Sequence, residues 1–190
     1  MALEIEKKYR LTDEQGETVA RRLIEVGATP KGKEFEENTI YVGNGLDPSR
    51  SVLRLRRVAG RAILTYKERF ESSDPDSAIR HQREDETRVE DPEALVAILV
   101  ALGYRLAIVY EKRRVKWYLM GTEVSVDELP FGLFMEIEGE EGAIREAERL
   151  LDLTDAEAEL ATYPELTERL GATKGDVIEA RFPDNHGETS

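Results

Sequence analysis

The chain opens with an alternation of apolar and charged side chains. Within residues 2–11, Leu3 and Ile5 alternate with Glu4 and Glu6. A period of two is typical of a β-strand that has one apolar and one polar face. Similar extended patterns return along the chain, so the sequence predicts about eight strands, the later ones at residues 34–42, 52–59, 62–69, 79–90, 106–118, 122–129 and 133–138.

Helical spacing of apolar residues appears between these strands. Thr12 and Gln15 match a capping box ahead of a helix that ends at Gly27. Pro92 opens a second helix, which ends at Gly103. Three more helical segments are expected after the last strand, at about residues 140–151, 155–162 and 164–170. Together with the hairpin joined at Gly60-Arg61, the pattern predicts an α+β fold of mostly antiparallel strands with few helices.

The polar faces of the strands carry charges in a repeated order. Glu4 and Glu6 share a face of the first strand, and Glu136 and Glu138 share a face of the last. Acidic and basic residues, several of them in pairs, also occur on the polar faces of the strands between them, at Arg54, Arg56, Lys67, Arg80, Glu84, Glu86, Lys112, Arg114 and Asp127. A single pair of this kind belongs to a solvent-exposed strand face roughly four times in five. Solvent exposure explains less well why acidic pairs occur on the first and last strands with basic pairs between them.

Two arrangements of these faces are possible. If the charged faces point into a closed barrel, the lumen is an ion-binding tunnel and helices cover the apolar outside. If they point outward, the protein is an ordinary barrel or sandwich with a solvated skin. In the first arrangement, carboxylates hold divalent cations while Arg and Lys bind phosphate oxygens.

Composition limits the chemistry further. The 190 residues include no cysteine, and the two histidines, His81 and His186, lie far apart. Any metal is therefore expected to have oxygen ligands, which favours Mg²⁺, Mn²⁺ or Ca²⁺ and, in the function expected below, Mg²⁺ or Mn²⁺. The net charge of -13 argues against binding nucleic acid or an anionic membrane. No stretch resembles a membrane span or signal peptide, so a cytoplasmic location is expected.

The order of these motifs resembles the CYTH superfamily, the triphosphate tunnel metalloenzymes. Glu4-x-Glu6-x-Lys8 is similar to the N-terminal hallmark of that family, and Leu53-Arg54-Leu55-Arg56 to its arginine strand. The resemblance continues to about residue 140, through Thr65-Tyr66-Lys67, Glu84-x-Glu86, Lys112-x-Arg114, Val126-Asp127 and Gly132-x-Phe134-x-Glu136-x-Glu138. The sequence departs from the family where Gln82 replaces a usual arginine and where Val42-Gly43 follows Tyr41.

This resemblance implies a closed tunnel of eight antiparallel strands with helices packed outside. It also implies metal ligands at Glu4, Glu6, Asp127, Glu136 and Glu138, with Glu84 and Glu86 as helpers. The residues expected to bind the triphosphate are Lys8, Arg54, Arg56, Lys67, Arg80, Lys112 and Arg114. Lys8 and Tyr41 are the candidates that orient the nucleophile. One domain is expected over residues 1–172, followed by a polar, mobile tail at 173–190.

Three functions remain open at this level. The family includes inorganic and thiamine triphosphatases and class IV adenylate cyclases, so metal-dependent hydrolysis of a triphosphate and cyclisation of ATP both fit the motifs. We favour hydrolysis, because nothing in the sequence explains adenine recognition. A non-catalytic polyphosphate- or nucleotide-binding module is the third reading, although simple anion binding would not need so many carboxylates. The expected partner is a triphosphate-containing small molecule, and a homodimer is left open.

Overall fold

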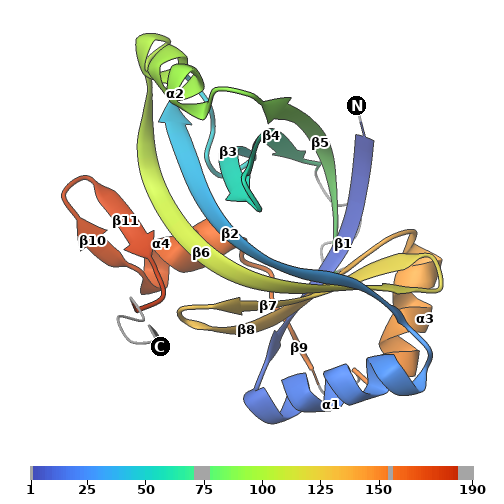
Figure 1. Ribbon diagram of the computed structural model, residues 1–190. Coiled ribbons are helices and arrows are strands. Elements are labelled where there is room, and N and C mark those ends of the chain that lie inside the picture. The colour runs from blue at the N-terminus through green and yellow to red at the C-terminus, as the bar shows by residue number, and fades with distance from the viewer. Residues whose placement is uncertain (1, 71–77, 154–155, 184–190) are drawn as a thin grey trace.

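A closed ring of eight strands forms the body of the molecule (Figure 1). The computed structural model describes residues 2–70, 78–153 and 156–183. Around the ring the strands follow the order β6-β2-β3-β4-β5-β1-β8-β7, and β7 pairs with β6 to close it. All eight pairings are antiparallel. The closed eight-stranded barrel is therefore confirmed, with β1 (Ala2–Leu11), β2 (Thr29–Gly43), β3 (Ser51–Val58), β4 (Arg61–Arg69), β5 (Ile79–Val89), β6 (Tyr104–Leu119), β7 (Thr122–Leu129) and β8 (Gly132–Glu138).

In the described part of the chain, four helices lie outside the ring, as Figure 1 shows by their placement. They are α1 (Asp13–Glu25), α2 (Pro92–Ala101), α3 (Glu141–Leu151) and α4 (Tyr163–Leu170). The expected capping box at Thr12 and Gln15 is present, because each side chain bonds the other's backbone N–H. None of the helices in the described part of the chain has the length and apolarity needed to cross a bilayer.

The apolar faces of the strands point away from the lumen. Beneath α1 and α3, Leu23 and Ile144 pack against Met135 and Ile137 of β8. A second cluster under α2 contains Leu55, with the remaining members Tyr41, Leu53, Ala62 and Leu99. Burying one such leucine stabilises the fold by about 2 kcal/mol. Because the two faces of a strand point in opposite directions, this outer packing turns the charged faces inward, which decides between the two arrangements.

The segment after α3 differs from the sequence prediction. A helix was expected at about 155–162, but Glu157–Ala158 forms the short strand β9, which pairs with β1, while residues 154–155 lie outside the described chain. The polar side chains of this segment bind the barrel instead of continuing a helix: Glu159 accepts hydrogen bonds from Arg10. Soon after this segment, Thr162 and Glu165 form the capping box that begins α4.

The expected polar tail also contains structure. Residues 172–174 and 177–180 form the strands β10 (Ala172–Lys174) and β11 (Val177–Ala180), and β11 pairs in parallel with β6. Arg181 anchors this end by ion pairs with Glu37 and Glu111. Residues 173–180 of the expected tail thus contribute to two short strands, its last part, 184–190, lies outside the described residues, and the mobility of the tail stays a prediction. The division at residue 172 stays a prediction.

Candidate active site

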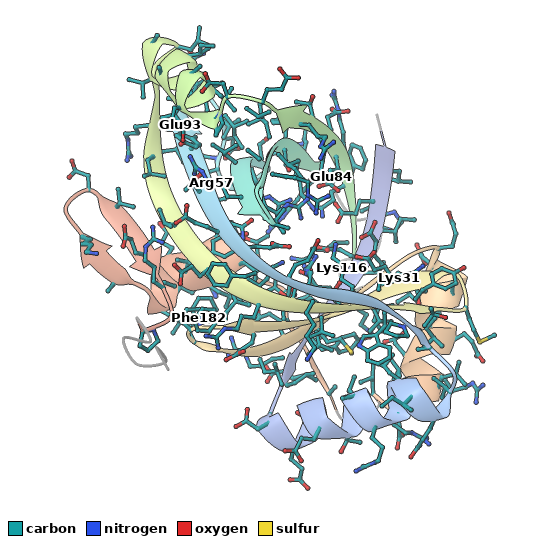
Figure 2. The ribbon with its side chains drawn as sticks, viewed as in Figure 1. Lys31, Arg57, Glu84, Glu93, Lys116 and Phe182 are labelled. Carbon is teal, nitrogen blue, oxygen red and sulfur yellow. The ribbon has the colours of Figure 1, made fainter. Side chains whose placement is uncertain are left out.

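The lumen holds a cavity of about 270 Å³ that is lined mainly by charged side chains. Nine basic and seven acidic residues contribute to its walls, so the lining is net positive inside a chain of net charge -13. Glu84 and Lys116 are two of these side chains (Figure 2). Since local charge dominates within a Debye length of about 8–10 Å, this cavity can attract an anion that the protein surface repels.

One wall of the cavity combines acids of β1 with bases of β4 and β5. The Lys67 ammonium lies 2.6 Å from Glu4 Oε2, and Arg80 lies 2.8 Å from Glu6. Gln82, which stands where the family usually has arginine, donates a hydrogen bond of 3.0 Å to Glu4. Burial raises the pKa of the Glu4 carboxyl, although Lys67 opposes this. The departure at Gln82 therefore leaves Glu4 with a hydrogen bond rather than a second cation.

The opposite wall is a buried cluster around Asp127. Arg114 donates two hydrogen bonds of 2.6 Å to the Asp127 carboxylate and a third to Glu136. Lys112 Nζ lies 3.4 Å from both Asp127 and Glu36. Burial opposes the ionisation of Glu136, but Arg114 and the neighbouring lysines hold its pKa below the usual range. Buried ion pairs of this kind add little net stability, because desolvation offsets their attraction, so their arrangement points to a function.

Arg54 and Arg56 extend the basic surface along β3. Their guanidinium groups lie 3.5 Å and 3.0 Å from Glu86, and Arg54 lies 3.8 Å from Glu84. The Nε atoms of both arginines are buried and have no hydrogen-bond partner among the described residues. Unsatisfied donors that face a polar cavity are available to a ligand that carries acceptor oxygens.

Lys8 lies where the two walls meet. It is 2% exposed, its Nζ donates to the Ala161 carbonyl at 3.0 Å, and it lies 3.5 Å from Glu136. Its ammonium also lies 3.9 Å from the centre of the Tyr163 ring. Burial, with a contribution from Arg80, lowers the pKa of Lys8 to about 8. The lysine is thus held from three sides.

The carboxylates fit a divalent cation chemically. The donors are all oxygens, which suits Mg²⁺ or Mn²⁺. Glu138 makes no ion pair among the described residues, and partial desolvation and the nearby Glu4 raise its pKa to about 7. The pKa of a carboxyl group rises in this way when it is partly buried near another carboxylate and has no cation paired with it. Within the described chain no three acidic or histidine side chains already converge as a ligand group, because most of the acids are engaged by Lys and Arg.

One of the residues expected in the site lies elsewhere. Tyr41 is buried in the apolar cluster under α2, on the outer face of β2. The register explains this: Ile40 pairs with the inward-facing Arg54, so Tyr41, which pairs with Leu53, must face outward. Tyr41 is accordingly absent from the tunnel lining, although it lines a neighbouring cavity, and its role in orienting a nucleophile stays a prediction. The structure brings the other predicted site residues together in and around the lumen.

The sequence did not reveal several residues of the site. Tyr163, at the start of α4, lines the cavity, and its hydroxyl donates to Asp127 at 2.7 Å. Tyr110 lines the cavity as well, and Glu36 and Asn38 are fully buried beside it. Tyr110, Glu36 and Asn38 fall on the inward period of β6 and β2, so strand alternation could have identified them. Tyr163 carries no such signal, since it reaches the site from a helix.

The fold and the lumen together define a class: a closed antiparallel barrel whose interior is a tunnel of opposed acidic and basic side chains. Comparisons with known proteins agree with this description. The sequence matches the CYTH domain over residues 2–169, so the chain belongs to the CYTH family.

Three of the proteins similar to this chain come from archaea. A protein of Methanocaldococcus jannaschii that is provisionally named adenylate cyclase MJ0240 is 25% identical over 190 residues, covering 97% of this chain and 99% of the relative. The solved structure of the PH1012 protein of Pyrococcus horikoshii has a TM-score of 0.73 and 27% identity, covering 86% of this chain and 98% of that one. The PH1819 protein of the same organism has a TM-score of 0.69 and 28% identity, covering 87% and 98%.

Proposed function

We propose that this CYTH-family protein hydrolyses a triphosphate with the help of Mg²⁺ or Mn²⁺. The observation that supports this most is the tunnel itself, in which the basic side chains of β3, β4 and β6 face the carboxylates of β1 and β8 across one cavity. A chain of phosphates needs cations along its whole length, and a metal that bridges phosphate to protein needs carboxylates nearby.

The basic residues bind and orient the substrate in this proposal. Arg54 and Arg56 present forked donors suited to phosphate oxygens, and the lysines act as point charges. The full set is Lys8, Arg54, Arg56, Lys67, Arg80, Lys112 and Arg114. Metal ions would be held by Glu4, Glu6, Asp127, Glu136 and Glu138, with Glu84 and Glu86 as helpers. When bound, they neutralise phosphate charge and activate the attacking water.

Hydrolysis forms a bond between the water oxygen and the terminal phosphorus. The bond from that phosphorus to the bridging oxygen breaks, the leaving phosphate chain takes the electron pair, and the water releases a proton to solvent. Lys8 donates hydrogen bonds to the substrate's oxygens from its fixed position beside Glu136 and Tyr163. Arg114 and Lys112 stabilise the charge that develops on the leaving group. With Tyr41 outside the tunnel, Lys8 is the residue left to orient the nucleophile.

Cyclisation of ATP is the second candidate, because the Methanocaldococcus jannaschii relative is provisionally named an adenylate cyclase. In that reaction the ribose 3′-hydroxyl attacks the α-phosphorus and pyrophosphate leaves. The same basic side chains could stabilise either leaving group, so the products must distinguish the two reactions.

The test is a product assay. The purified protein is incubated with tripolyphosphate, thiamine triphosphate and ATP, each with Mg²⁺ or Mn²⁺, and phosphate, pyrophosphate and cyclic AMP are measured. Phosphate as the main product supports hydrolysis, while cyclic AMP with pyrophosphate supports the cyclase. Tight binding of all three compounds without turnover would make the protein a binding module and refute both reactions.

A further inference from the structure

Glu36 of β2 is a buried acid that has no part in the chemistry proposed above. Strand β2 lies between β3 and β6 in the ring (Figure 1). The register opposes Glu36 to Lys112 of β6, and alternation along β2 turns its side chain toward the lumen, as it does that of Asn38. Glu36 is 0% exposed and does not line the tunnel cavity, whereas Arg56 and Lys112 do. The carboxylate therefore lies behind the cations that face the cavity.

Cations surround this carboxylate on two sides. Lys112 Nζ lies 3.4 Å from Glu36 Oε2, and Arg56 Nη1 lies 3.8 Å from Glu36 Oε1. Asn38 Nδ2 donates a hydrogen bond of 3.4 Å to Oε2. Burial opposes the ionisation of Glu36, but the cations of β3 and β6, Lys112 foremost, hold its pKa below the usual range. Glu36 is thus an anion enclosed by the basic residues of these two strands.

Neither phosphate binding nor stability explains an acid in this position. Its negative charge opposes the attraction between a polyanion and the neighbouring cations. A buried ion pair adds little net stability, because desolvation offsets its attraction. Part of the hydrogen-bonding capacity is also unused, since Glu36 Oε1 and Asn38 Oδ1 are buried without a hydrogen-bond partner among the described residues. A different role for the carboxylate is therefore indicated.

The carboxylate counteracts repulsion among the cations of the tunnel. Burial lowers the pKa of Lys112 and the charge of Arg114 adds to this, whereas Asp127 and Glu36 oppose it. The Lys112 ammonium lies 3.4 Å from Asp127 of β7 and 3.4 Å from Glu36 of β2, so acids on two strands hold it between them. The other oxygen of Glu36 restrains the guanidinium group of Arg56 in the same way.

We propose that Glu36 is a positioning residue that fixes Lys112 and Arg56 in the directions from which they bind the phosphates of the substrate. It acts through these two cations and does not itself touch the substrate. This inference rests on the proposed function, because it assumes a triphosphate in the tunnel. Since Lys112 stabilises the leaving group in the proposed reaction, the position of its ammonium affects the rate more than it affects binding.

Loss of the Glu36 charge has two opposite effects on the tunnel. The cavity becomes more positive, so phosphate binds as tightly as before or more tightly. Lys112 and Arg56 lose a restraint, so the rate of the chemical step falls, and a misplacement of about 1 Å can reduce a rate by about 100-fold. A residue that serves stability alone would leave the kinetics of the folded protein unaltered.

The experiment compares Glu36→Gln with Glu37→Gln. The second variant is the matched control, because Glu37 is the next residue of β2 and pairs with Arg57 and Arg181 on the outer face. The first measured quantity is kcat for the triphosphate that the wild-type protein turns over fastest, with saturating Mg²⁺. The second is the Kd of tripolyphosphate in EDTA, from calorimetry. For Glu36→Gln we expect kcat to fall at least about tenfold with Kd unaltered or lower. The control should keep both wild-type values.

Two further variants keep the test decisive. Glu36→Asp retains the charge but draws the carboxylate away from the cations, so its kcat should lie between those of the wild type and Glu36→Gln. In a double-mutant cycle, Glu36→Gln should reduce kcat by a smaller factor when Lys112→Met is already present, because Glu36 acts partly through that lysine. Thermal unfolding checks that each variant is folded. Where Glu36→Gln does not fold, a wild-type kcat in Glu36→Asp overturns the inference.

The outcomes separate this inference from the function beneath it. Wild-type kcat in folded Glu36→Gln overturns the positioning role and leaves triphosphate hydrolysis standing. A Kd more than about tenfold higher would place Glu36 in phosphate binding, and a higher Mg²⁺ concentration for half-maximal activity would make it a metal ligand; either result overturns the inference. Absence of turnover of every triphosphate by the wild-type protein overturns the proposed function, and the inference falls with it.

Discussion

At the residue scale, Lys8 and Tyr163 depend on each other although they are far apart in sequence. The tyrosine ring lies under the lysine ammonium, and the tyrosine hydroxyl binds Asp127, which Arg114 also binds. Burial and the neighbouring Asp127 raise the pKa of Tyr163, so this hydroxyl stays a donor. One helix residue therefore restrains a base on β1 and an acid on β7.

Removing the Tyr163 hydroxyl tests this restraint. Tyr163→Phe keeps the ring but loses a hydrogen bond to a charged acceptor, so we expect the free energy of unfolding to fall by about 1.5 kcal/mol. We also expect kcat for triphosphate hydrolysis to fall, with a smaller change in KM. Urea unfolding and steady-state kinetics measure the two effects. Tyr118→Phe, on an exposed side chain of β6, is the control. A stability loss with unaltered kcat would make Tyr163 purely structural.

Glu136 tests the acidic side of the site. Glu136→Gln keeps the shape of the side chain but removes the charge next to Arg114 and Lys8. We expect kcat/KM to fall by about 100-fold, the size seen when one electrostatic group is removed from a site. The Mg²⁺ concentration for half-maximal activity should rise as well. Glu146→Gln, an exposed residue of α3 paired with Arg149, should keep wild-type kinetics. Equal activity of both variants would exclude Glu136 from the metal site.

At the scale of elements, the β3–β4 hairpin was the clearest sequence signal. The structure places its two-residue turn at Ala59-Gly60, one position before the expected Gly60-Arg61. Both residues have positive φ, at 48° and 71°, as a type I′ turn requires. A non-glycine residue rarely adopts this conformation, so the hairpin carries a local cost at Ala59.

Replacing that alanine should relieve the cost. Asn is among the residues that tolerate positive φ and is favoured before Gly in this turn. We therefore expect Ala59→Asn to raise the free energy of unfolding by about 0.5 kcal/mol. Ala97→Asn, on the exposed face of α2, should instead lower it by about 0.6 kcal/mol, because Asn is a poorer helix former than Ala. Urea denaturation measures the change in the free energy of unfolding for both variants. A loss of stability in Ala59→Asn would contradict this interpretation of the turn.

At the scale of the whole molecule, closure of the barrel concentrates positive charge in an acidic protein. The tunnel lining has more bases than acids, although acidic residues outnumber basic ones by 40 to 27 in the chain. Because side chains of alternate residues face opposite sides, one ring of strands separates a charged interior from an apolar outer layer under the helices.

Removing divalent cations tests how this interior works. We expect EDTA to abolish hydrolysis and added Mg²⁺ or Mn²⁺ to restore it, since the proposed chemistry needs a metal to activate water. Tripolyphosphate should still raise the midpoint of thermal unfolding in EDTA, because the basic side chains bind phosphate without the metal. Phosphate release and thermal shift assays measure the two effects. Full activity in EDTA would remove the metal from the mechanism.

The sequence by itself determined the eight strands of the barrel, the first capping box and the charges on each strand face. These follow from local periodicity and hydrogen bonding, which depend on neighbours along the chain. It predicted the tunnel only by resemblance, since no strand by itself shows which of its faces is covered. It named Tyr41 as a site residue from the family pattern alone, and that pattern does not carry the register of β2, which turns Tyr41 away from the tunnel.

Only the tertiary structure decided which way the charged faces point, what holds Lys8, and how the start of α4 reaches the lumen. The side chain of Tyr163 lies beside Lys8 because the chain returns to the barrel 155 residues later, and such long-range proximity leaves no trace in local spacing. A second cavity, lined by residues of β2, β3, β6, α4 and β11, arises in the same way, from strands and a helix that meet only when the barrel has closed. Side-chain alternation is a property of one strand, whereas a cavity is a property of the surfaces that surround it.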